Sequence, residues 1–131
     1  MPIKIKNLEL NEPKEGKISV FIITKNEQER IKEAIESVNE IADEIVIVDS
    51  GSEDSTKKIA KSYKKVKWYF NEWPGYGKQK KYAESLCRNE WVFNIDADER
   101  ATKRLCDELR KIAQKKSHKV DAYKVDVRIK S

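Results

Sequence analysis

Four short runs of β-forming residues, each followed by a helical pattern, constrain the fold of this 131-residue chain more than any other feature. The runs expected to form strands are 18–23, 44–48, 66–70 and 91–95. The helices expected after them are 31–38, 54–64, 78–88 and 102–115. Near-continuous apolar runs are typical of parallel strands buried on both faces. The alternation therefore predicts a doubly wound α/β domain, a three-layer sandwich with a mostly parallel sheet and helices on both faces.

The two ends of the chain are less regular. Residues 1–17 are expected to be an N-terminal extension that adds an edge strand or stays loose, and 18–131 to be the domain proper. Residues 122–129 alternate with period two, which predicts a last strand with one wet face. Asn26 followed by Glu29 resembles a capping box at the start of the first helix.

Charge and hydropathy narrow the class of protein. There are 28 basic and 23 acidic residues, a net charge of +5, which suits an anionic ligand such as a phosphate ester. The same charge would attract the chain weakly to an anionic membrane surface, so a peripheral contact with the inner membrane is expected. The charge is too small and too dispersed along the chain to indicate binding to nucleic acid. The longest apolar stretch, 20–23, is far too short for a membrane helix, and no secretory signal is recognised, so a cytoplasmic protein is expected.

The cysteines and the histidine give little chemistry. Cys87 and Cys106 are expected to be reduced thiols, since their spacing is not that of a metal site. His118 lies in a lysine-rich stretch and is expected to be solvated. A chain with one histidine cannot build a multi-histidine zinc site.

Polar residues follow three of the four predicted strands at the point where each strand ends. In a doubly wound sheet, ligands bind in the crevice beyond the carboxyl ends of the strands. The residues placed there are Thr24, Asn26 and Glu27, then Asp49, Ser50, Gly51, Ser52 and Asp54, and finally Asp96, Asp98 and Glu99. Acidic residues at successive strand ends indicate a cation or a polar ligand with several donors.

Asp96 and Asp98 form the most informative pair. In an extended stretch, residues i and i+2 point the same way, so the two carboxylates can hold a hard divalent ion and leave positions for phosphate oxygens and water. The alternative is that Asp98 merely starts the following helix, where negative charge is favoured. In the preceding turn, Asp49 is the better ligand candidate, and Ser52 or Asp54 is expected to cap the second helix.

Three lysines, Lys78, Lys80 and Lys81, open the third predicted helix. Cations there oppose the helix dipole, and a bound anion would offset this, although a solvated lysine cluster is the simpler interpretation. Neither G-x-x-x-x-G-K-[ST] nor G-x-G-x-x-G follows the first strand. This argues against P-loop ATPases and ordinary dinucleotide-binding dehydrogenases.

Taken together, the segments 18–27, 44–56, 75–80 and 91–100 resemble family 2 glycosyltransferases of the GT-A fold, and within that family the lipopolysaccharide-core β-glucosyltransferase branch. The resemblance implies a nucleotide-diphosphate-sugar donor, often a UDP-sugar, with Mg²⁺ or Mn²⁺. It also implies inverting transfer of the sugar to a glycan or lipid-linked acceptor.

The resemblance assigns roles to the residues that match the family's motifs. Thr24, Asn26 and Glu27 would line the nucleoside pocket. Asp49 would contact the base, and Lys80 stands where the family commonly has a cation near the base and the phosphates.

The resemblance assigns residues to the metal site but none to the catalytic base. Asp96 would contact the ribose or the metal, and Asp98 would ligate the metal, whereas Lys81 departs from the asparagine common at its position. Family members usually exceed 200 residues, and their catalytic base lies beyond this acidic motif. Asp121 and Asp126 lie downstream without a family motif around them, so no catalytic base is assigned.

Three hypotheses remain at the level of sequence. The chain is the donor-binding half of a glycosyltransferase, a non-enzymatic nucleotide- or metal-binding module derived from one, or a different α/β protein such as a phosphotransfer receiver domain. The last needs a lysine after a later strand, and the lysines at 78–81 open a helix instead. Nothing in the sequence indicates an oligomeric state.

Overall fold

A computed structural model describes residues 3–5 and 16–114 of the chain. The described elements, in chain order, are β1 (Ile3–Ile5), β2 (Ile18–Thr24), α1 (Ile31–Asn39), β3 (Ala42–Asp49), α2 (Thr56–Lys61), β4 (Val66–Phe70), α3 (Tyr76–Ser85), β5 (Trp91–Asn94) and α4 (Lys103–Gln114). The last predicted strand, 122–129, and His118 lie outside the described residues. Among the described helices, none is long and apolar enough to span a bilayer.

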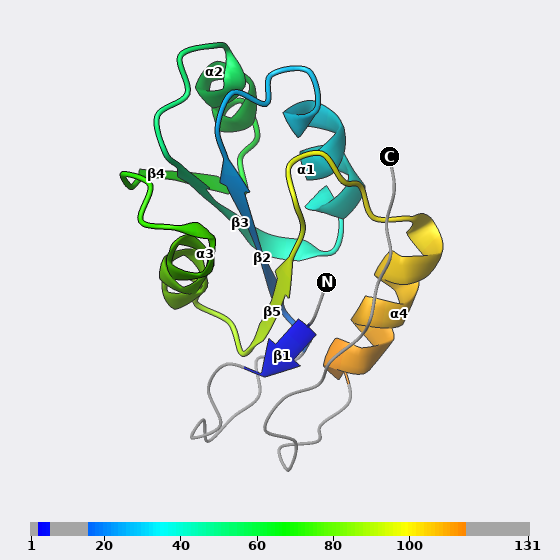
Figure 1. The fold of residues 1–131 in the computed structure, drawn as a ribbon. Coiled ribbons are helices and arrows are strands. Elements are labelled where there is room, and N and C mark those ends of the chain that lie inside the picture. Colours follow the sequence, from blue (N-terminus) through cyan, green and yellow to red (C-terminus); the bar gives the residue numbers. More distant parts are fainter. Residues whose placement is uncertain (1–2, 6–15, 115–131) are drawn as a thin grey trace.

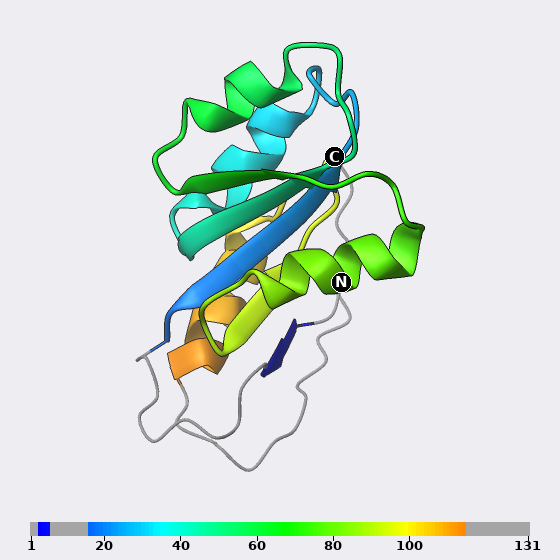
Figure 2. The same cartoon turned by 90° about the vertical axis from the view of Figure 1, so that its left-hand side faces the viewer.

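The strands form one sheet with the order β1-β5-β2-β3-β4, which can be followed in Figure 2. β2, β3, β4 and β5 are mutually parallel, and β1 adds to the edge as an antiparallel strand against β5. The chain moves outward from β2 to β4 and then crosses back to β5 on the other side of β2. This reversal confirms the doubly wound topology and places a switch point between β2 and β5.

Helices cover both faces of the sheet, as predicted. α1 and α4 lie on one side and α3 on the other (Figure 1). Alternate strand residues face the two layers, since Val20 and Ile22 pack with the helices α1, α2 and α4, whereas Phe21 and Ile23 pack with α3. Every residue of β2 is buried, which agrees with the mostly apolar sequence of this strand on both faces.

The predicted helices are correct in number but differ in detail. α1 begins at Ile31, after Arg30 and without a side-chain cap, so the capping box predicted at Asn26 is wrong. α2 covers only Thr56–Lys61 rather than 54–64, and α3 runs from Tyr76 to Ser85 rather than over 78–88. Ala60, Leu105 and Leu109 are buried as expected, while Ile59 and Ile112 are only partly buried.

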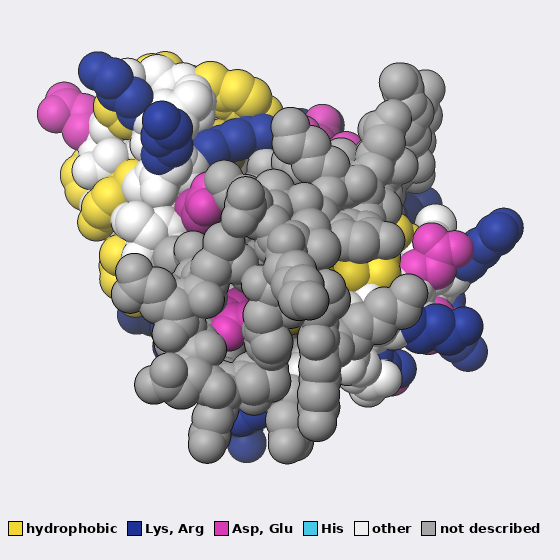
Figure 3. Space-filling view, turned by 90° about the horizontal axis from the view of Figure 1, so that it is seen from below, with side chains coloured by type: hydrophobic (Ala, Val, Ile, Leu, Met, Phe, Trp, Pro, Cys, Tyr) yellow, Lys and Arg dark blue, Asp and Glu magenta, His cyan; other side chains and the backbone are white. Residues whose placement is uncertain are grey.

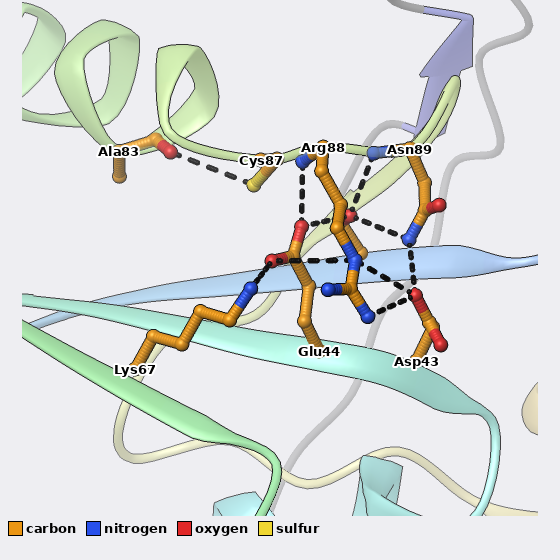
Figure 4. A network of polar contacts seen from close by, with 8 residues as sticks. Asp43, Glu44, Lys67, Ala83, Cys87, Arg88 and Asn89 are labelled. Carbon is orange, nitrogen blue, oxygen red and sulfur yellow. Dashed lines mark hydrogen bonds and ion pairs between the residues drawn. The ribbon is translucent and has the colours of Figure 1, made fainter.

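A buried polar network closes the amino end of the sheet (Figure 4). Glu44, 1% exposed, accepts hydrogen bonds from the Ser19 hydroxyl at 2.5 Å, the Arg88 backbone N–H at 2.6 Å and the Lys67 ammonium at 2.9 Å. Burial alone would raise the pKa of Glu44, but these three hydrogen bonds together with the charge of Lys67 lower it. A buried carboxylate is stable here because the chain supplies its donors.

Asp43 extends this network toward the surface. Its carboxylate accepts hydrogen bonds from the Arg88 guanidinium at 2.8 and 3.1 Å and from the Asn89 amide at 3.0 Å. Where described residues are visible from below, both basic and acidic side chains can be seen (Figure 3). We call Ser19, Asp43, Glu44, Lys67, Arg88 and Asn89 the amino-end network.

Candidate functional site

The carboxyl ends of β2, β3 and β5 meet at one edge of the sheet, as predicted. Thr24 at the end of β2 is in register with Asp49 at the end of β3. On the other side of β2, the backbone N–H of Ile95, just beyond β5, bonds to Phe21, so Asp96 emerges beside the same edge. This is the switch point of the sheet, where α/β proteins bind ligands.

Asp49 is the last residue of β3, at this edge of the sheet, and is 3% exposed. Its carboxylate accepts hydrogen bonds from the hydroxyls of Thr24 at 2.8 Å and Ser52 at 2.5 Å. It also accepts from the backbone N–H groups of Gly51 at 2.9 Å and Ser52 at 2.7 Å. These four bonds use the full acceptor capacity of a carboxylate, so Asp49 holds the turn after β3 in its present shape.

Asn26 joins the loops that follow β2 and β3. It has a positive φ of 53°, and its side-chain oxygen accepts a hydrogen bond from the Glu53 N–H at 2.8 Å, while its own N–H donates to Ser52 Oγ at 2.7 Å. Asparagine tolerates this left-handed conformation better than most residues. The side chain is therefore engaged between the two loops and does not cap α1.

The start of α2 is organised by Asp54. Its carboxylate accepts hydrogen bonds from the backbone N–H of Thr56 at 2.9 Å and from the Thr56 hydroxyl at 2.5 Å. The N-cap of α2 is Ser55, which makes no side-chain capping bond, so the prediction that Ser52 or Asp54 caps this helix is wrong. Asp54 instead bonds Thr56 from outside the helix, and the Ser52 hydroxyl donates to Asp49. Thr56 also accepts from the Glu27 N–H at 2.8 Å, a further link between the two loops.

An open cavity of about 410 Å³ lies above these loops. Its lining comes from three segments: the end of β2 and the following loop, the turn after β3, and the loop that leads into α3. The residues are Ile23, Thr24, Lys25, Glu27, Ser50, Trp73 and Tyr76. The volume falls in the range of small-molecule sites, and the cavity combines apolar walls with a few polar groups.

Asp96 stands at the side of α3 that faces this edge. Its Oδ1 atom is 3.8 Å from the Lys80 ammonium and 3.5 Å from the Tyr76 hydroxyl. Lys80 also lies over the Tyr76 ring, 4.5 Å from its centroid, in a cation–π arrangement. The structure thus brings Lys80 and Asp96 together beside Tyr76, which also lines the cavity.

The acidic loop after β5 has carboxylates that could hold a divalent metal. Asp96 is half-buried and Asp98 exposed, and Glu99 turns back to accept a hydrogen bond from the Asp96 N–H at 2.8 Å. Burial, together with the charges of Asp96 and Asp98, raises the pKa of Glu99. The loop therefore carries excess negative charge that a cation would relieve.

The ligand count fits a metal shared with a substrate rather than a closed protein site. Within residues 3–5 and 16–114, no three His, Cys, Asp or Glu side chains come close enough to hold a metal by themselves. Mg²⁺ commonly takes only one or two carboxylates and completes its shell with phosphate oxygens and water. Asp96 and Asp98 supply hard oxygen ligands of this kind.

The sequence analysis missed the residues that wall the cavity from the α3 side. Trp73 and Tyr76 flank Pro74 and Gly75 at the start of α3, and no role was predicted for either ring. Gln79, which is fully buried, exchanges hydrogen bonds with Asn71 across that turn. The available signal was the pair of large aromatic residues in a Pro-Gly turn, where no core position requires them.

Comparison with known proteins gives a consistent result. A sequence model of the family described as glycosyl transferase family 2 matches residues 19–131. An uncharacterised glycosyltransferase of Rickettsia bellii is 48% identical over 114 residues, which cover 86% of this chain and 38% of the relative. The lipopolysaccharide core biosynthesis glycosyltransferase LpsC of Rhizobium meliloti is 46% identical over 92 residues, 67% of this chain and 34% of the relative. The chain thus spans little more than a third of these curated relatives.

Solved structures show the same fold. Glucosyl-3-phosphoglycerate synthase of Mycobacterium tuberculosis, crystallised with Mn²⁺, UDP and glucosyl-3-phosphoglycerate, superposes with a TM-score of 0.56 at 25% identity, over 63% of this chain and 34% of the enzyme. The same enzyme has also been crystallised with Mg²⁺ and UDP. The chain and this enzyme share the GT-A arrangement of a parallel sheet between helices.

Proposed function

This chain belongs to glycosyl transferase family 2, and we propose that the crevice at the carboxyl ends of β2, β3 and β5 binds a nucleotide-diphosphate sugar, with UDP as the nucleotide. The observation that carries the proposal is the convergence of Thr24, Asp49 and Asp96 on one sheet edge beside Lys80. Hydrogen bonds to the Asp49 carboxylate hold Thr24 and the turn after β3 in place at this edge.

The nucleoside is assigned to the cavity between the β2 loop and α3. Thr24 and Glu27 line it, and Asn26 fixes the shape of the loop that carries them. A direct contact between Asp49 and the base requires that the Thr24 or Ser52 hydroxyl give up its hydrogen bond, because all four acceptor positions are used. Asp49 therefore contributes first by holding the turn beneath the base.

The diphosphate is assigned to the acidic loop after β5. Asp96 and Asp98 would hold Mg²⁺ or Mn²⁺, and this ion would neutralise charge on the leaving diphosphate when bound. Lys80, held between Asp96 and the Tyr76 ring, lies within reach of a phosphate oxygen and stabilises the same developing charge.

The transferred sugar would go to a glycan or lipid-linked acceptor with inversion at the anomeric carbon. This part of the proposal is supported by the name of the Rhizobium meliloti relative, which places that protein in lipopolysaccharide core biosynthesis. A base must take the acceptor's proton as the bond to the diphosphate breaks. Neither the described residues nor the family motifs in this chain identify that base.

A titration of the chain with UDP, with and without Mn²⁺, tests the proposal. We expect Mn²⁺ to tighten UDP binding at least tenfold and Asp98→Ala to remove this dependence. Glu108→Ala, an exposed carboxylate on α4 far along the chain, is the control and should bind as the unchanged chain does. Equal UDP affinity with and without metal in both the unchanged chain and Asp98→Ala would show that the carboxylate role is wrong.

A further inference from the structure

Trp73 and Tyr76 form an exposed pair of rings at the mouth of the cavity, which we call the aromatic wall. Trp73 is 52% exposed and Tyr76 54%, and their ring centroids are 6.1 Å apart at an interplanar angle of 49°. A single exposed aromatic residue is unremarkable, but two adjacent rings bordering a cavity offer apolar area to a ligand. Their exposure means that burial of these rings contributes little to the stability of the fold.

The loop that carries the aromatic wall is held rigidly. Asn71 donates a side-chain hydrogen bond to the Gln79 amide oxygen at 2.8 Å, and the Gln79 amide donates to the Asn71 carbonyl at 3.0 Å. The Asn71 N–H also bonds to the Asp49 carbonyl at 2.9 Å, which ties the loop to the end of β3. Two exposed rings on a fixed backbone are preorganised for a ligand, because little further order is lost on binding.

The surroundings of the aromatic wall favour a planar ring with polar edges. The other cavity residues include the hydroxyls of Thr24 and Ser50 and the apolar Ile23. Aromatic side chains stack on the faces of nucleobases, whereas hydroxyls and backbone groups bond to the edges. On the far side of Tyr76, Lys80 and Asp96 occupy the region assigned to the diphosphate.

We propose that the aromatic wall stacks on the base of the nucleotide donor, with Trp73 as the main contact. This inference rests on the proposed function and adds base recognition by a loop that the family resemblance did not assign. The donor's sugar is a poorer occupant, since base and sugar lie at opposite ends of the diphosphate. The proposed function assigns the nucleoside to the cavity lined by Thr24 and Glu27, and the aromatic wall lines this same cavity.

The test compares UDP with pyrophosphate, which lacks the base, by calorimetry in the presence of Mn²⁺. Trp73→Ala should weaken UDP binding about tenfold and leave pyrophosphate binding unchanged, whereas Trp73→Phe should restore most of the UDP affinity. Tyr82→Ala is the matched control, because Tyr82 is an exposed aromatic residue on α3 outside the cavity lining. UDP should also quench tryptophan fluorescence in the unchanged chain and not in Trp73→Phe.

The outcomes separate this inference from the proposed function. If UDP and pyrophosphate both bind and Trp73→Ala changes neither affinity, the aromatic wall does not recognise the base, while the diphosphate site stands. An equal loss of UDP and pyrophosphate affinity in Trp73→Ala would likewise overturn base stacking. If the unchanged chain binds neither compound, the proposed function fails and this inference fails with it.

Discussion

The two ends of the sheet both carry acidic residues beside strand termini, yet they differ in how those residues are used. At the amino end, Glu44 is fully buried and bonded to three donors of the chain. At the carboxyl end, the Asp96 carboxylate lies 3.5 Å from the Tyr76 hydroxyl and 3.8 Å from the Lys80 ammonium. The first carboxylate is fully committed to the fold, and the second has capacity left for a ligand.

Asp49 shows that position alone does not decide between these uses. It lies at the carboxyl end of β3, where ligands are expected, but four donors of the chain satisfy it as fully as Glu44 is satisfied. The comparison therefore teaches that an acidic residue at a strand end must be judged by the donors that already surround it. Four substitutions test this distinction.

The largest effect is expected for Glu44→Ala in the amino-end network. The substitution leaves the Ser19 hydroxyl and the Arg88 N–H buried without their acceptor, and Lys67 without its counter-ion. Lys67 is 41% exposed and can be solvated by water, whereas each donor left without its acceptor costs about 1–3 kcal/mol, so the free energy of unfolding should fall by roughly 3 kcal/mol. Urea denaturation followed by circular dichroism measures this loss.

Asp96→Ala is the counterpart of Glu44→Ala at the other end. A half-exposed ion pair at 3.8 Å contributes less than about 1 kcal/mol, so stability should change little while Mn²⁺-dependent UDP binding is lost. The folded fraction of Glu44→Ala should retain that binding. If Glu44→Ala were as stable as the unchanged chain, the amino-end network would not hold the fold together.

Asp49→Asn tests the intermediate case. An amide has a single acceptor oxygen and cannot satisfy the four donors that meet at Asp49, and its own NH₂ group would face some of them. We expect a loss of about 1–3 kcal/mol in the free energy of unfolding, measured as for Glu44→Ala. Unchanged stability with complete loss of UDP binding would instead mark Asp49 as a ligand residue, contrary to the comparison.

The sequence predicted the strands well because their burial on both faces leaves a plain apolar pattern. The predicted run at 66–70 matches β4, and β2 and β5 differ from prediction by one residue at their ends. The meeting of Thr24, Asp49 and Asp96 at one edge followed from the topology rule for parallel sheets. Position along the sheet is thus readable from hydrophobic pattern and chain order.

The parts that were missed depend on partners far apart in the chain. Asn26 looked like a helix cap, but its oxygen bonds to Glu53, which only the folded loops bring close. Gln79 looked like one polar residue among exposed lysines, yet it is buried because Asn71 satisfies its amide. A local pattern records burial and propensity, and it does not record which distant donor meets which acceptor.

The smallest effect is expected at the margin of the amino-end network, where Asp43 meets Arg88. Burial would raise the pKa of Asp43, but the hydrogen bonds from Asn89 and Arg88, together with positive charge, hold it below the ordinary 3.8. A carboxyl with a lowered pKa stabilises the fold above its unfolded pKa, and this stabilisation disappears as the pH falls through its folded pKa. The Arg88 side chain is 53% exposed, so its share is under about 1 kcal/mol.

Arg88→Met should therefore lower the free energy of unfolding by a few tenths of a kcal/mol at pH 7, and the difference should shrink as the pH falls below 3.8 through the lowered pKa of Asp43. The substitution keeps the backbone N–H that serves Glu44, and it removes the Asp43 pair together with the longer 4.0 Å ion pair between the guanidinium and Glu44. Urea denaturation from pH 7 to pH 2.5 measures both curves. A difference as large as that of Glu44→Ala, or one that does not shrink at all as the pH falls, would show that Arg88 supports the fold by packing rather than by its charge. Packing of the Arg88 side chain, rather than hydrogen bonds and charges at the carboxylates, would then stabilise this part of the amino end.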